Sequence, residues 1–316
     1  MNGSSKQFRR DLMSALSPAV VAALHDLELA ARLVVEGVRA GGHRSPLHGY
    51  SAEFQQHRPY RAGDDLKHLD WKVLARTDRL YTRQFRETTS LSAMLVLDSS
   101  ASMAFPPTGI SKFRYASVIA AALAYLISTQ GDAVGLMSMQ GDDFAFIPAR
   151  GGRPHLRALI ARIDGLDPAG TWDAPRTIAR AAELLRRRGV VIVISDFYDA
   201  EDETGRALRR VARVGHDIVM LHVVSPEETT FPYHGDLAFV DLESGERRLV
   251  DAAGIETAYR TALREFLERC RTRAMRDGMD YALLSTGDPP ERALREYLLR
   301  RNAPTAAAPA DRRGVG

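Results

Sequence analysis

The stretch of sequence that decides the fold covers residues 91–103 and reads LSAMLVLDSSASM. Its first half is apolar and has the length of a buried strand, and Asp98 stands directly after it. Ser100 and Ser102 follow at alternate positions of the next loop. In open α/β sheets the ligand crevice lies at the carboxyl ends of the strands. We therefore expect one carboxylate and two hydroxyls to converge at one edge of a sheet.

A second apolar segment, VVIVIS at residues 190–195, ends in Asp196. A run of β-branched residues of this length suits a parallel strand that is buried on both faces. If the two strands are neighbours, Asp98 and Asp196 lie at the same edge of the sheet. The loop Pro168–Thr171 precedes a predicted helix and adds a further hydroxyl.

Outward from these strands, strand and helix patterns alternate along the chain. The predicted strands are 91–98, 133–139, 144–149, 190–195, 217–224 and 281–286. The predicted helices are 112–129, 153–164, 174–188, 204–214, 254–277 and 290–301. A hairpin is predicted over residues 237–251, with its turn at Ser244 and Gly245. Such alternation predicts a doubly wound, mostly parallel α/β sheet.

The sequence divides into three parts. Residues 1–90 hold a predicted helix over 17–41 and a segment dense in charged and aromatic residues, in which the pattern at 80–84 indicates a strand. Residues 91–302 form the α/β domain. Residues 303–316 show no pattern, and we expect this tail to be disordered.

The composition is that of a globular protein of about two domains. The chain has 316 residues, of which 45% are hydrophobic and 26% charged, and its formal net charge is +3. The one cysteine, Cys270, excludes an internal disulfide and a cysteine-based zinc site, which favours a reducing compartment. No apolar run reaches the ~20 residues that a bilayer requires, and the first residues lack the apolar core of a secretory signal. We expect a cytoplasmic protein without membrane spans.

Oxygen ligands without histidine or cysteine suit a hard cation such as Mg²⁺, with Mn²⁺ as a substitute. If the carboxylates act partly through water, the bound cation stays short of negative charge and attracts a carboxylate from another protein. A metal site would in this way become a protein-binding site. The alternative is that Ser100 and Ser102 cap the following helix and that both aspartates are solvated.

The motif DSSASM after an apolar strand resembles the metal-ion-dependent adhesion site (MIDAS) of von Willebrand factor A domains. The segments GDAVGLMSM at 131–139, GTWDAPRTI at 170–178 and VVIVISD at 190–196 are similar to the second strand and the remaining site loops of such domains. Ala101 and Phe197 stand where glycine is common in that family. The resemblance implies a von Willebrand A-like, Rossmann-like fold. It also implies the metal residues Asp98, Ser100, Ser102, Thr171 and Asp196.

The upstream segment 53–87 is similar to the signature of a bacterial family called domain of unknown function fifty-eight, and the resemblance covers about residues 40–225. That family is associated with MoxR-type AAA+ ATPases, and the pair is thought to serve protein maturation or the assembly of metal centres. Some members carry N-terminal membrane helices, which this sequence lacks, so the resemblance implies a soluble form. The charged segment either forms internal ion pairs or docks a partner through Arg58, Arg61, Asp64, Asp65, Asp70, Trp71 and Arg76.

The sequence therefore predicts a non-enzymatic, metal-ion-dependent protein-binding module that works with a MoxR-type ATPase or its client in a chaperone-like assembly role. A metal-dependent phosphohydrolase is one alternative, but the haloacid-dehalogenase type needs a second acid where Ser100 stands. There is also no P-loop and no G-x-S-x-G elbow. An arginine-rich nucleic-acid-binding protein is the other alternative. The helix near 256–276 carries many arginines, but its glutamates indicate a solvated face with internal ion pairs.

Overall fold

The central element is a six-stranded sheet. The computed structural model describes residues 26–40, 53–59, 73, 80–86, 91–140, 143–185, 187–198, 201–243 and 245–302. The strands are β3 (Ser92–Leu97), β4 (Ala133–Gln140), β5 (Asp143–Arg150), β6 (Val190–Ser195), β7 (Asp217–Val224) and β10 (Asp280–Ser285). Their order is β10-β7-β6-β3-β4-β5, and all neighbours are parallel except β4 and β5. The predicted doubly wound, mostly parallel sheet is confirmed.

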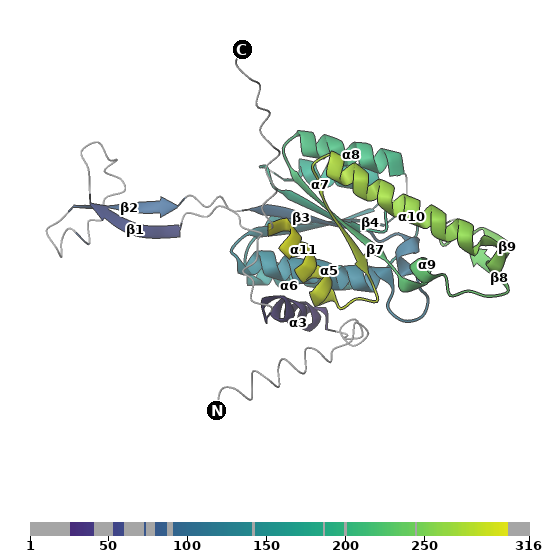
Figure 1. Ribbon diagram of the computed structural model, residues 1–316. Helices are drawn as coiled ribbons and strands as arrows, with labels where there is room; N and C mark the ends of the chain where they lie inside the picture. The colour runs from purple at the N-terminus through teal and green to yellow at the C-terminus, as the bar shows by residue number, and fades with distance from the viewer. Residues whose placement is uncertain are drawn as a thin grey trace, which may run out of the picture.

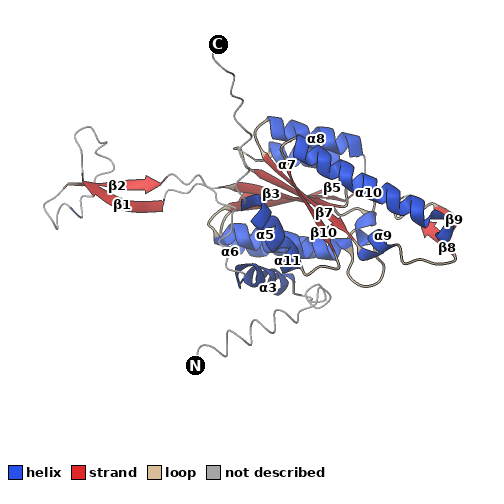
Figure 2. Cartoon of the chain, viewed as in Figure 1, coloured by secondary structure: helices blue, strands red, loops and turns tan. Residues whose placement is uncertain are grey.

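Helices cover both faces of this sheet (Figure 1 and Figure 2). One layer holds α3 (Leu27–Ala40), α5 (Lys112–Thr129), α6 (Arg153–Asp164) and α11 (Pro290–Asn302). The other holds α7 (Ala174–Glu183), α8 (Glu201–Arg213) and α10 (Ala252–Arg276). Each layer packs its own cluster of buried apolar side chains against the sheet. Helix α5 is buried along most of its length because it lies between the sheet and α3.

Most predicted elements agree with the structure to within a few residues, and α5, α6, β6 and β7 agree at both ends. Helix α7 is shorter than predicted, because the chain leaves the helix after Glu183 and turns into β6. The strand predicted around residue 82 is β2 (Tyr81–Arg86), and its antiparallel partner β1 (Glu53–Pro59) was not predicted. Residues 1–25 and the tail 303–316 lie outside the described residues.

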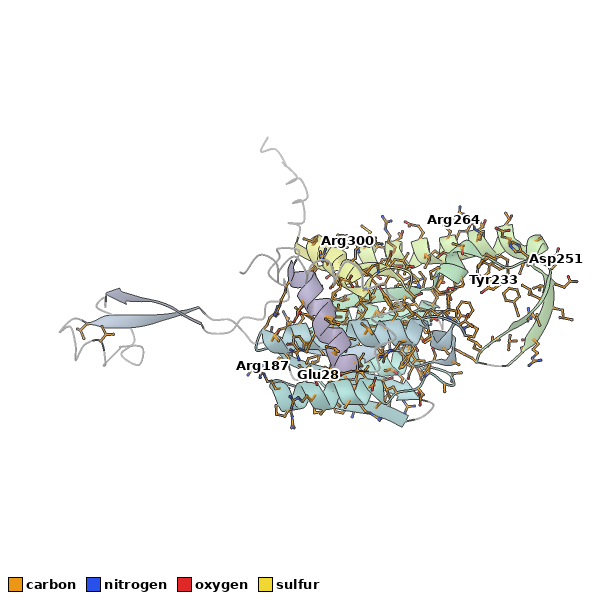
Figure 3. The ribbon with its side chains drawn as sticks, turned by 90° about the horizontal axis from the view of Figure 1, so that it is seen from below. Glu28, Arg187, Tyr233, Asp251, Arg264 and Arg300 are labelled. Atoms are coloured by element: carbon orange, nitrogen blue, oxygen red, sulfur yellow. The ribbon has the colours of Figure 1, made fainter. Side chains whose placement is uncertain are left out.

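A segment that we call the arm follows β7. It consists of the short helix α9 (Pro226–Thr230), the predicted hairpin of β8 (Asp236–Val240) and β9 (Arg247–Asp251), and α10. The hairpin lies at the start of α10, beyond the edge of the sheet (Figure 1; Figure 3 labels Tyr233 and Asp251). Contacts among aromatic rings attach it there, from Phe231, Tyr233, Phe239 and Tyr259. None of the helices in the described residues is both long enough and apolar enough to cross a membrane.

The pairing of β3 with β6 positions the site. The two strands are parallel and in register, with Leu97 opposite Ile194. The backbone N–H of Asp98 also donates to the carbonyl of Ile194 at 3.0 Å. The residues that follow the two strands therefore start from neighbouring points on the same sheet edge.

The close approach of Gly189 to β3 yields a stability prediction. A Cβ at this buried glycine would collide with the carbonyl oxygen of Ser92. Overpacking of this kind costs about 1–3 kcal/mol or more, so Gly189→Ala should lower the free energy of unfolding by that amount in urea denaturation. At exposed Gly151 a Cβ would meet only the Asp132 carbonyl oxygen at 3.7 Å. Gly151→Ala should therefore change stability by less than ~0.5 kcal/mol, and equal effects of the two substitutions would contradict the prediction.

Candidate functional site

The loop after β3 brings the predicted oxygen side chains together. Asp98 and Ser100 are buried, and the Ser100 backbone N–H donates to Asp98 Oδ1 at 2.8 Å. The hydroxyls of Ser100 and Ser102 share a hydrogen bond of 3.0 Å. The alternative of solvated aspartates is wrong, because Asp98 is 1% and Asp196 is 2% exposed. Ser100 does stand at the N-cap of η2 (Ala101–Ala104), but its side chain forms no capping hydrogen bond.

The loop that carries Thr171 is attached to the same place. The Ala169 N–H donates to the Ser99 carbonyl at 2.9 Å, and the Ala101 N–H donates to the Gly170 carbonyl at 2.9 Å. These two backbone bonds bring Thr171, which is exposed, next to the loop of the two serines. The third hydroxyl predicted for the site therefore comes from the neighbouring loop.

Asp196 lies beside Asp98 but is already paired. Ser195, which precedes it, donates from its hydroxyl to Asp98 Oδ2 at 2.6 Å. Asp196 Oδ2 accepts from Lys112 Nζ at 2.7 Å, and Asp196 Oδ1 accepts from the Tyr198 N–H at 3.3 Å. Both oxygens of Asp196 are thus engaged by other groups of the protein, as are both oxygens of Asp98, and what distinguishes Asp196 is its ion pair with a buried lysine.

The lysine that holds Asp196 also holds a third carboxylate. Lys112 is the first residue of α5 and is 1% exposed, and its Nζ donates to Glu228 Oε1 at 2.7 Å. Glu228 belongs to α9, where it forms a capping box with Ser225. The Tyr198 hydroxyl donates to the same Oε1 at 3.2 Å, and Lys112 Nζ lies 4.7 Å from the centre of the Tyr198 ring.

Lys112 and Glu228 were missed from the sequence. Lys112 is one of four lysines among 43 basic residues, and it opens a helix that is otherwise largely apolar. A lysine as the first residue of such a helix, shortly after the Asp98 motif, is the signal that could have indicated a buried partner. Glu228 gives no comparable signal, because it stands in an ordinary helix start after Ser225 and Pro226.

Burial dominates the electrostatics of the site. Burial, reinforced by the charge of Asp196, raises the pKa of Asp98 to about 7, although hydrogen bonds from Ser195 and Ser100 act in the opposite direction. Burial lowers the pKa of Lys112, but the attraction of Asp196 and Glu228 outweighs it, so the net shift is upward. The Lys112 side chain therefore stays protonated, and it pairs with two carboxylates at once.

Phe197 shows how β6 ends at the site. Its φ is 55°, the left-handed conformation that glycine favours. The side chain is buried, and the Phe197 N–H donates to the Ser195 hydroxyl at 2.8 Å. These contacts stabilise the turn after β6, in which the Asp196 carboxylate pairs with Lys112.

The donor set at the end of β3 is one of hydroxyl and carboxylate oxygens. In the described residues no group of three or more His, Cys, Asp or Glu side chains could hold a metal ion. A cation site in this part of the chain would therefore depend on Ser100, Ser102 and Thr171 together with Asp98. Oxygen donors of this kind suit Mg²⁺ or Mn²⁺.

The other predicted residues are not tested. For Arg58 the structure describes only the backbone, as part of β1, and Arg61, Asp64, Asp65, Asp70, Trp71 and Arg76 lie outside the described residues. On α10, by contrast, the expected ion pairs are present. Arg260 pairs with Glu256 at 3.1 Å, and Arg273 with Asp202 of α8 at 2.8 Å.

Comparison with known proteins assigns the family. Residues 56–272 match the family described as "Protein of unknown function DUF58", and the chain belongs to this family. It is 34% identical to the uncharacterized protein Rv1480 of Mycobacterium tuberculosis over 231 residues, 72% of each chain. It is also 29% identical to the uncharacterized protein YeaD of Bacillus subtilis over 134 residues, which are 40% of this chain and 31% of YeaD.

Two solved structures are similar in fold. One is the conserved hypothetical protein BatB from Bacteroides thetaiotaomicron, with 16% identity, a TM-score of 0.46, and coverage of 67% of this chain and 98% of BatB. The other is the VWA domain of SpRpn10, with 14% identity, a TM-score of 0.39, and coverage of 68% of this chain and 96% of that domain.

The bridging hydroxyl of Ser195 yields a second stability prediction. Ser195→Ala removes a buried hydrogen bond to Asp98 and another from the Phe197 N–H. A hydrogen bond to a charged group contributes about 1.5–3 kcal/mol, so urea denaturation should show a loss of that size. Ser128 is half-buried and its side chain forms no hydrogen bond to the described residues. Ser128→Ala should change stability by less than ~0.5 kcal/mol, and an equally small loss for Ser195→Ala would show that the bridge is unimportant.

Proposed function

We propose that this chain is a protein-binding module whose contact with its partner depends on a divalent cation, Mg²⁺ or Mn²⁺, at the end of β3. The observation that carries the proposal is the convergence of Ser100, Ser102 and Asp98. Thr171 and Asp196 lie beside them on the neighbouring loops. The proposal assigns no reaction to the chain, because these groups form a ligand set and not a nucleophile with its base.

The spacing of the two serine hydroxyls supports a cation of this size. Mg²⁺ prefers octahedral coordination with bonds of 2.0–2.1 Å, so that adjacent ligand oxygens lie about 2.9 Å apart. The oxygens of Ser100 and Ser102 are 3.0 Å apart. This separation matches that of adjacent ligands on one cation, which would replace the hydrogen bond between the two hydroxyls, and the exposed Thr171 would supply a third hydroxyl.

The balance of buried charges supports the binding of a divalent cation. Asp98, Asp196 and Glu228 are all buried, and the one buried cation among the described residues, Lys112, pairs with Asp196 and Glu228. With all four groups ionised, two negative charges remain uncompensated, and buried charges are costly unless they are paired. One divalent cation supplies the charge that is missing.

A cation held mainly by neutral hydroxyls retains an affinity for a further negative ligand. A carboxylate on the surface of another protein fits that requirement, so the cation would bridge the two proteins. The partner that we propose is a MoxR-type AAA+ ATPase, or a client protein of such an ATPase, in protein maturation or complex assembly.

Calorimetric titration of metal-depleted protein with Mg²⁺ and Mn²⁺ tests the site. Wild-type protein should bind one cation, and Asp98→Asn should raise the Kd by about tenfold to a hundredfold or more. The matched control is Asp173→Asn, because Asp173 lies near Thr171 but is exposed and caps α7. Equal affinities for the wild type and Asp98→Asn would contradict the proposed function.

Co-purification with the MoxR-type ATPase tests the bridge. The two proteins should associate in Mg²⁺ and separate when a chelator is added, and Ser100→Ala should weaken the complex in the same way. The Asp173→Asn protein should behave like the wild type. Association that survives the chelator would leave a partner but reject the cation as the bridge.

A further inference from the structure

Lys112 is an unusual feature of this sheet edge. Its side chain is 1% exposed, and its Nζ lies 2.7 Å from both Asp196 Oδ2 and Glu228 Oε1. Lysine is almost never fully buried unless it is paired. Here the ammonium pairs with one of the two aspartates that the sequence predicts as cation ligands.

The pairing gives Asp196 a cationic partner that Asp98 lacks, because the contacts of Asp98 come from the neutral Ser195 hydroxyl and Ser100 N–H. One oxygen accepts from Lys112 and the other from the Tyr198 N–H. To reach a cation at the serine loop, Asp196 would have to break the ion pair and leave Lys112 with Glu228 alone. Separating a buried ion pair is strongly unfavourable because it leaves a buried charge uncompensated, whereas a cation bound by the serine and threonine hydroxyls and Asp98 leaves the pair intact.

Lys112 itself is fixed in place from several sides. Its backbone begins α5, which Ser111 caps. The rings of Tyr198 and Phe105 flank the ammonium, at 4.7 and 5.8 Å from their centres. Glu228 is held by the Ser225 N–H at 2.7 Å and by the Tyr198 hydroxyl. These contacts keep the ammonium at Glu228 and oppose its movement with Asp196.

We propose that Lys112 is a positioning residue that holds Asp196 outside the coordination sphere of the cation and sets the charge of the site. The cation is then held by Asp98, Ser100, Ser102 and Thr171 alone. Affinity is lower than with two carboxylate ligands, and a coordination position stays open for the partner's carboxylate. This inference rests on the proposed function, because it concerns the same cation.

Three substitutions separate the charge of the site from the release of Asp196. Lys112→Met frees Asp196 and makes the site more negative. Lys112→Met combined with Glu228→Gln frees Asp196 at the same net charge as in the wild type, and it leaves fewer unpaired carboxylates if the single variant folds poorly. Glu228→Gln alone keeps Asp196 on Lys112 and makes the site less negative.

Titration with Mn²⁺ measures the Kd of each variant for the cation, and circular dichroism checks that each variant is folded. Lys112→Met should lower the Kd by about tenfold or more. The double variant should also bind more tightly than the wild type, and Glu228→Gln should bind more weakly. Added Mn²⁺ should raise the Tm of both Lys112 variants more than that of the wild type. A merely structural role of Lys112 would weaken binding instead.

The outcomes distinguish this inference from the proposed function. If Asp98→Asn abolishes binding but the folded Lys112 variants bind no more tightly than the wild type, the role of Lys112 is overturned and the cation site stands. If neither Lys112 variant folds, an unchanged Kd in Glu228→Gln overturns the inference. If the wild type binds no Mn²⁺, the proposed function fails and this inference fails with it.

Discussion

A carboxylate that is buried loses its hydration, and it stays ionised only beside a positive charge or several hydrogen-bond donors. This constraint applies to three buried carboxylates at the carboxyl end of the sheet, those of Asp98, Asp196 and Glu228. Lys112 neutralises two of them, while Asp98 depends on the Ser195 hydroxyl and the Ser100 N–H. The ends of β3, β6 and β7 and the start of α5 are tied together through these contacts.

The fold could be predicted because its signals are local. The run VVIVIS marks β6 without any knowledge of its neighbours, and Ser100 and Ser102 converge because they belong to one short loop. The ion pairs of Lys112 could not be predicted in this way. They join residues 84 and 116 positions apart in the chain, and only the packing of α5 and α9 against the sheet edge brings these residues together. Strand β1 was missed for the same reason, since its pairing with β2 crosses a long segment.

Two kinds of positive charge have separate roles in this account. Lys112 is built into the chain and secures Asp196 and Glu228 at all times. The divalent cation of the proposed function would bind at Asp98 and the hydroxyls, where Thr171 is open to solvent. In this arrangement the cation, which can exchange with solvent, would lie on the side that a partner can approach. The fixed ion pairs of Lys112 reach through Glu228 to α9, where the arm begins.

The most direct test is a crystal structure of the protein grown with Mn²⁺, with the ion located by its anomalous scattering. The account predicts one ion bounded by the oxygens of Ser100, Ser102, Thr171 and Asp98, with Lys112 Nζ still on Asp196. An ion bound directly by Asp196, with Lys112 displaced, would contradict the role of Lys112. No ion at this sheet edge at saturating Mn²⁺ would contradict the cation site altogether.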